Sequence, residues 1–130
     1  MEVEKARSQL DRADPRWQEH ITLLAGDVRD DALPDQVAQF VPDGARCFVV
    51  EDSAHRHHTT LAALEGFSRF GRPGGFFIVE DGCVDVEGMR LGKDWHPRKR
   101  WPRGVIPAIS DWLAGPGHDF VVRRIWSCTG

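Results

Sequence analysis

Two short stretches, CFVVEDSAH (residues 47–55) and GGFFIVED (residues 74–81), decide the fold class of this chain. In each, a run of apolar residues ends at two acids. Short apolar runs of this kind are typical of strands buried on both faces of a parallel sheet. A helical pattern over residues 59–70 lies between them and completes a strand–helix–strand crossover. The sequence therefore predicts an α/β domain.

The two acidic strand ends are expected to lie side by side. Asp52 and Glu80 are 28 residues apart, about the length of one crossover, so they should end neighbouring parallel strands. Ligands of open α/β sheets bind outside the carboxyl ends of the strands. An alternative stays open, because carboxylates at strand ends also stabilise the positive ends of the helices that follow.

Further elements are expected on both sides of this unit, within one domain that spans residues 1–130. Apolar patterning predicts strands at residues 21–24 and 120–122. It predicts helices at residues 33–41 and 106–113, each with a proline in its first turn.

Composition narrows the function classes. The 130 residues carry 17 Lys and Arg against 20 Asp and Glu, a net charge of −3, and 41% of them are hydrophobic. No apolar stretch approaches the length of a membrane span, and the balance of charge argues against a nucleic-acid partner. The charged N-terminus lacks a secretory signal, so we expect a cytoplasmic protein.

The residues after the first acidic strand end, Asp52 to His58, carry three histidines. Carboxylate ligands favour magnesium, calcium or manganese, and His55 is placed to take a proton from a substrate hydroxyl. A zinc or non-haem iron site built on His55, His57 and His58 is a weaker alternative. For His57 and His58 the favoured expectation is that they are first-turn helix residues exposed to water.

A basic segment, residues 89–103, has six cationic residues against one acid, a local charge of +5, with two tryptophans among them. Such a segment suits phosphorylated, sulfated or nucleic-acid ligands, although a solvated loop is the commoner explanation of a run of this kind. Because it follows the second acidic strand end, we expect it to hang over the same crevice as a lid or specificity loop.

Four motifs occur in order: ITLLAGD (21–27), FVVEDSAH (48–55), LAALEGF (61–67) and GGFFIVEDG (74–82). Together they resemble the cephalosporin hydroxylase and rhamnosyl O-methyltransferase family, which has the class I S-adenosylmethionine-dependent methyltransferase fold. The resemblance implies a three-layer Rossmann-like domain with a mostly parallel sheet.

The resemblance also implies an activity: metal-assisted transfer of a methyl group from S-adenosylmethionine to a hydroxyl of a sugar or other small molecule. The implied residues are Asp52, Glu80 and Asp81 for magnesium, His55 as general base, and Glu2 and Asp27 for the cofactor.

The chain departs from the family pattern because it has no Gly-rich cofactor turn. We therefore expect the C-terminal part of a methyltransferase domain, truncated at its N-terminus. Two alternatives remain: a non-catalytic remnant or interaction module of the same fold, and a metal-dependent hydrolase that uses the same carboxylates. Self-association into a homo-oligomer is also open.

Overall fold

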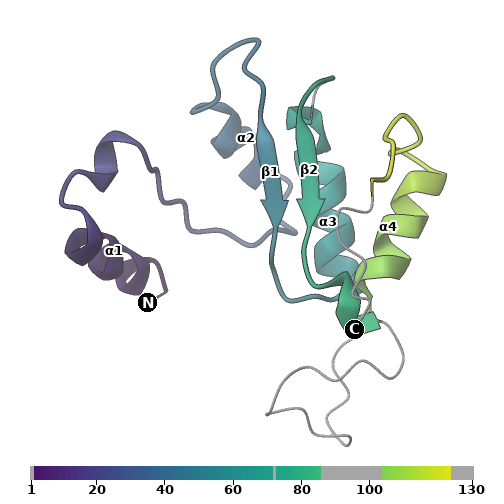
Figure 1. Cartoon of the computed structure of the whole chain (residues 1–130), viewed down its shortest axis with the longest axis horizontal. Helices are drawn as coiled ribbons and strands as arrows, with labels where there is room; N and C mark the ends of the chain where they lie inside the picture. The colour runs from purple at the N-terminus through teal and green to yellow at the C-terminus, as the bar shows by residue number, and fades with distance from the viewer. Residues whose placement is uncertain (1, 72, 86–103, 124–130) are drawn as a thin grey trace, which may run out of the picture.

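The sheet consists of two parallel strands that carry the acidic ends. The computed structural model describes residues 2–71, 73–85 and 104–123. In it, β1 (Phe48–Glu51) and β2 (Phe76–Val79) lie side by side and run in the same direction (Figure 1). Their register pairs Phe48 with Phe76 and Glu51 with Val79. The predicted α/β class and the parallel pairing are confirmed.

Two helices form the core beside this sheet. α3 (His57–Phe67), which continues into a 3₁₀ turn at Ser68–Phe70, packs against β1, and α4 (Val105–Ala114) packs against α3. Their interface holds the most buried side chains of the core: Thr60, Ala63, Leu64, Val105, Ala108 and Trp112. None of the helices in the described residues is both long enough and apolar enough to cross a membrane.

A close backbone contact joins the start of α4 to the start of α3. A Cβ atom on Gly104 would lie 2.2 Å from the backbone nitrogen of His57, so this position requires glycine. His57 also pairs with α4, since its Nε2 lies 2.7 Å from an Asp111 carboxylate oxygen.

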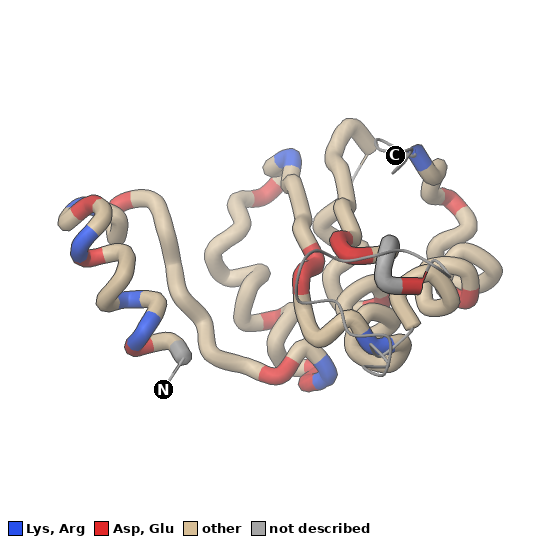
Figure 2. Tube along the Cα trace, turned by 60° about the horizontal axis from the view of Figure 1, so that its bottom comes forward, with Lys and Arg blue, Asp and Glu red and all other residues tan. Residues whose placement is uncertain are grey.

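The N-terminal helix α1 (Glu2–Ala13) stands apart from the sheet in both views (Figures 1 and 2). It packs on Trp17, whose indole nitrogen donates a hydrogen bond to Asp11 at 2.8 Å and whose ring lies under the Arg7 guanidinium. Helix α1 was not predicted, because its apolar positions are few. Helix α2 (Leu33–Ala38) is shorter than predicted and contacts α3 through Pro34 and Gly66.

Two predicted strands are wrong. Residues 21–24 and 120–122 form no strand in the described part of the chain, although residues 21–24 are apolar. An apolar run becomes a strand only where a neighbouring strand pairs with it through hydrogen bonds, and among the described residues β1 and β2 pair only with each other. Phe120 instead packs its ring 4.7 Å from that of Trp112.

One face of the two-stranded sheet is open within the described residues. Phe48 and Phe76 are about 60% exposed, at 63% and 59%, and their ring centroids are 6.4 Å apart. The opposite face carries Glu51, which is buried toward α3. In the described residues the helical core therefore lies on one side of the sheet.

Asp85 links the end of β2 to α4 and should contribute to stability. Its two carboxylate oxygens accept hydrogen bonds from the backbone N–H groups of Gly104 at 2.8 Å and Ile106 at 2.7 Å. Because these donors have no partner within the helix, we expect Asp85→Ala to lower the free energy of unfolding by about 1–2 kcal/mol, with a smaller loss for Asp85→Asn. Urea unfolding followed by circular dichroism measures this.

Asp119→Ala is the matched control, because Asp119 is 87% exposed and pairs only with the neighbouring His118 in the described structure. It should change the free energy of unfolding by less than about 0.5 kcal/mol. An Asp85→Ala protein as stable as this control would show that the two hydrogen bonds do not hold α4.

Candidate metal centre

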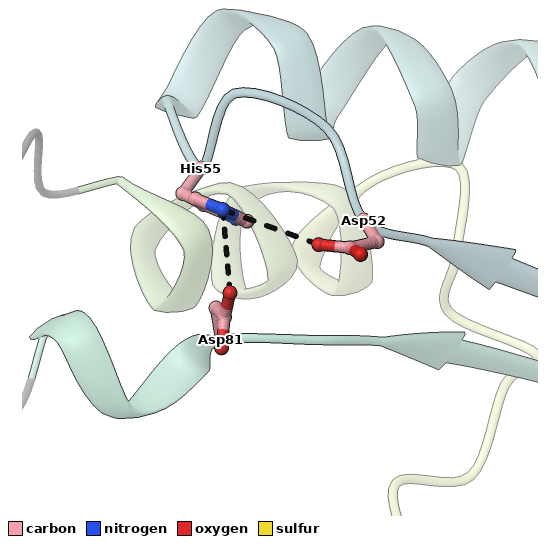
Figure 3. A group of neighbouring side chains, drawn as sticks. All are labelled: Asp52, His55 and Asp81. Atoms are coloured by element: carbon pink, nitrogen blue, oxygen red, sulfur yellow. Dashed lines mark ion pairs between the residues drawn. The ribbon is translucent and has the colours of Figure 1, made fainter. Parts of the chain in front are cut away.

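Three side chains from two strand ends and one turn converge on a common point. His55 Nε2 lies 3.2 Å from a carboxylate oxygen of Asp81 and 4.0 Å from one of Asp52 (Figure 3). Each residue offers one ligand atom, and these atoms lie within 4.8 Å of one another. The group sits at the carboxyl ends of β1 and β2, where the sequence predicted a site.

The backbone adopts an uncommon conformation at two of the three residues. The φ angles are +54° at His55 and +56° at Asp81, in the left-handed region that residues other than glycine rarely enter. Each such residue costs on the order of 1 kcal/mol, and residues of this kind cluster at functional sites. Here the two turns bring His55 and Asp81 face to face.

The chemistry of the group fits a divalent cation. Two carboxylates held this close repel each other, and a cation between them removes that repulsion. The Asp52 and Asp81 side chains are exposed enough to be reached from solvent, whereas His55 is largely buried and its Nδ1 makes no hydrogen bond in the described structure. Two oxygens and one imidazole nitrogen suit manganese well, and the carboxylates alone suit magnesium.

Comparison with protein families gives one match that covers nearly the whole chain. The family model described as rhamnosyl O-methyltransferase/CmcI matches residues 1–126. The chain belongs to this family. It is an O-methyltransferase family, so the resemblance seen in the motifs is confirmed. Searches of curated proteins and of solved structures gave no match.

Within this member of the rhamnosyl O-methyltransferase/CmcI family, the predicted ligand Glu80 does not join the group. Its side chain is exposed, and its backbone N–H donates to the Glu51 carbonyl oxygen at 3.0 Å, extending the pairing of the strands. The left-handed backbone at Asp81 turns the chain immediately afterwards, and Asp81 faces His55. A role for Glu80 as a ligand stays a prediction.

The two residues predicted to bind the cofactor lie elsewhere. Asp27 is exposed and accepts hydrogen bonds from the backbone, Nε and Nη2 of Arg29, and these bonds hold the pKa of its carboxyl below the usual range. Glu2 is the first residue of helix α1. Their roles in cofactor binding stay predictions.

The three-histidine alternative finds no support in the geometry. Of the three, His55 alone belongs to the group of ligand atoms, while His57 turns to Asp111 at 2.7 Å. His55 lies in the turn before α3 and has a left-handed backbone conformation, whereas His57 begins the helix, so the two side chains are directed to different places. The basic segment 89–103 lies outside the described residues.

The left-handed conformation of Asp81 gives a direct stability test. Glycine adopts this conformation freely and alanine does not, so Asp81→Gly should have a free energy of unfolding about 1 kcal/mol higher than Asp81→Ala. Asp81 is exposed, and neither variant loses much packing. Urea unfolding of the two variants measures the difference. Equal stability, or a more stable alanine variant, would show that the turn at residue 81 carries no such cost.

Proposed function

We propose that this chain acts as an S-adenosylmethionine-dependent, metal-assisted O-methyltransferase on a hydroxyl of a sugar or other small molecule. The observation that carries the proposal is the convergence of Asp52, His55 and Asp81 at the strand ends in a member of an O-methyltransferase family. Support for S-adenosylmethionine comes from the family alone, since Glu2 and Asp27 are not gathered at this site.

Each of the three residues would have its own role in the reaction. Asp52 and Asp81 would hold a divalent cation, which when bound lowers the pKa of a substrate hydroxyl. His55 would take the hydroxyl proton, because its Nε2 lies beside both carboxylates. Asp81, 3.2 Å from that nitrogen, would stabilise the imidazolium that forms. S-adenosylmethionine would supply the methyl group.

A metal-dependent hydrolase is the second candidate, because two carboxylates and a histidine around a cation also activate water. Family membership favours methyl transfer over hydrolysis. The two candidates differ in one measurable property, namely whether the chain binds S-adenosylmethionine.

Calorimetric titration of the purified chain with S-adenosylmethionine, with and without Mg²⁺, therefore tests the proposal. We expect heat of binding for the cofactor, because a methyltransferase must hold its methyl donor before transfer. Absence of cofactor binding under both conditions would contradict methyl transfer by this chain.

A second titration, with Mg²⁺ alone, tests the cation site separately. Asp52→Asn should weaken Mg²⁺ binding by about tenfold or more, whereas Glu80→Gln, its matched control at the neighbouring strand end, should stay within about threefold of the wild type. If both variants lose Mg²⁺ affinity equally, Glu80 is also a ligand. If Asp52→Asn loses no Mg²⁺ affinity, the cation binds elsewhere.

A further inference from the structure

The last residue of β1, Glu51, is an ionisable side chain inside the core. It is only 5% exposed, while the next residue, Asp52, faces the candidate metal centre. A buried carboxylate is costly unless hydrogen bonds compensate for the lost water. The groups that surround Glu51 therefore indicate what it does.

In the described structure all hydrogen-bond partners of the Glu51 side chain are donors, and they lie at the start of the turn that carries the site and in the helix after it. At the start of the turn, Ser53 donates both its backbone N–H, at 3.0 Å, and its hydroxyl to Glu51 Oε1. In the first turns of α3, the hydroxyl of the fully buried Thr60 donates to Oε2 at 3.5 Å. One carboxylate thus joins the beginning of residues 52–56 to the helix that follows them.

The turn needs such a connection. Residues 52–56 contain no helix or strand, and His55 within them holds the left-handed backbone conformation. Conformations of this kind persist only where the surroundings impose them. The Glu51 carboxylate supplies that restraint, because it accepts hydrogen bonds from Ser53 before His55 and from Thr60 after it. A carboxylate only accepts hydrogen bonds, which matches these three donors.

We propose that Glu51 is a positioning residue of the candidate metal centre, holding the 52–56 turn so that Asp52 and His55 face Asp81. The role of the cation in this proposal rests on the proposed function. The arrangement of the turn rests on the contacts of Glu51 alone. Glu51 itself lies outside the group of ligand atoms and contacts no reacting group.

The test compares Glu51→Met with the wild type in two readouts. Methionine keeps the length of the side chain but has no oxygen to accept the hydrogen bonds of Ser53 and Thr60, so the restraint is lost. Loss of residues that orient metal ligands typically costs 10–100-fold in metal affinity, so we expect the dissociation constant for Mn²⁺ to rise by about tenfold or more. Without metal, the ¹⁵N shifts of the His55 ring should change, because Nε2 is no longer held against Asp81.

Leu64→Val is the matched control. It removes one methylene from a buried position of the same helix, α3, and should leave both readouts unchanged although it lowers stability. If Glu51→Met does not fold, Thr60→Val removes the donor on α3 and is measured with the same two readouts, with an expected rise of a few-fold in the dissociation constant.

Each outcome decides the proposal. Where the wild type binds Mn²⁺, a folded Glu51→Met protein with affinity within about twofold of the wild type overturns it. If the wild type binds no Mn²⁺, the metal-assisted mechanism of the proposed function is wrong, and the positioning role is then judged from the ¹⁵N shifts of the His55 ring alone. Shifts that differ between the variant and the wild type support the positioning role, and identical shifts overturn it. Equal loss of affinity in Leu64→Val would also overturn it.

Discussion

The site depends on the parallel register between β1 and β2. Because Glu51 lies opposite Val79, the two strands end at the same level, and the residues that follow them start from neighbouring points. Asp52 and Asp81 reach the same space for that reason. A shift in register would separate the carboxylates and move every side chain of the shifted strand to the other face of the sheet. The buried α3–α4 interface supports this arrangement from one side of the sheet.

The ends of the two strands combine two uncommon backbone conformations with a buried carboxylate. His55 and Asp81 both occupy the left-handed region, and the carboxylate of Glu51 is taken out of water beneath them. These features oppose stability individually, yet they occur within a few residues of one another and orient the same three side chains. Hydrogen bonds from Ser53 and Thr60 offset the burial of Glu51.

Much of this arrangement follows from the sequence. Apolar runs ending in acids predicted both strands, their parallel pairing and the convergence of Asp52 with the 80–81 pair. The sequence pattern could not predict which of Glu80 and Asp81 faces His55, because that depends on a backbone conformation set by the surrounding fold. It was misleading for residues 21–24 and 120–122, since periodicity records apolar character but not the presence of a neighbouring strand. Helix α1 was not predicted, because its apolar positions are few and its described contact is with the nearby Trp17.

The proposed function requires a cation bound between the ends of the two strands. Crystals of the chain soaked with Mn²⁺ and measured at the manganese absorption edge would locate the ion by its anomalous scattering. We expect an anomalous peak within coordination distance of the carboxylates of Asp52 and Asp81, beside His55. A peak held by other residues, or none at this site, would contradict it.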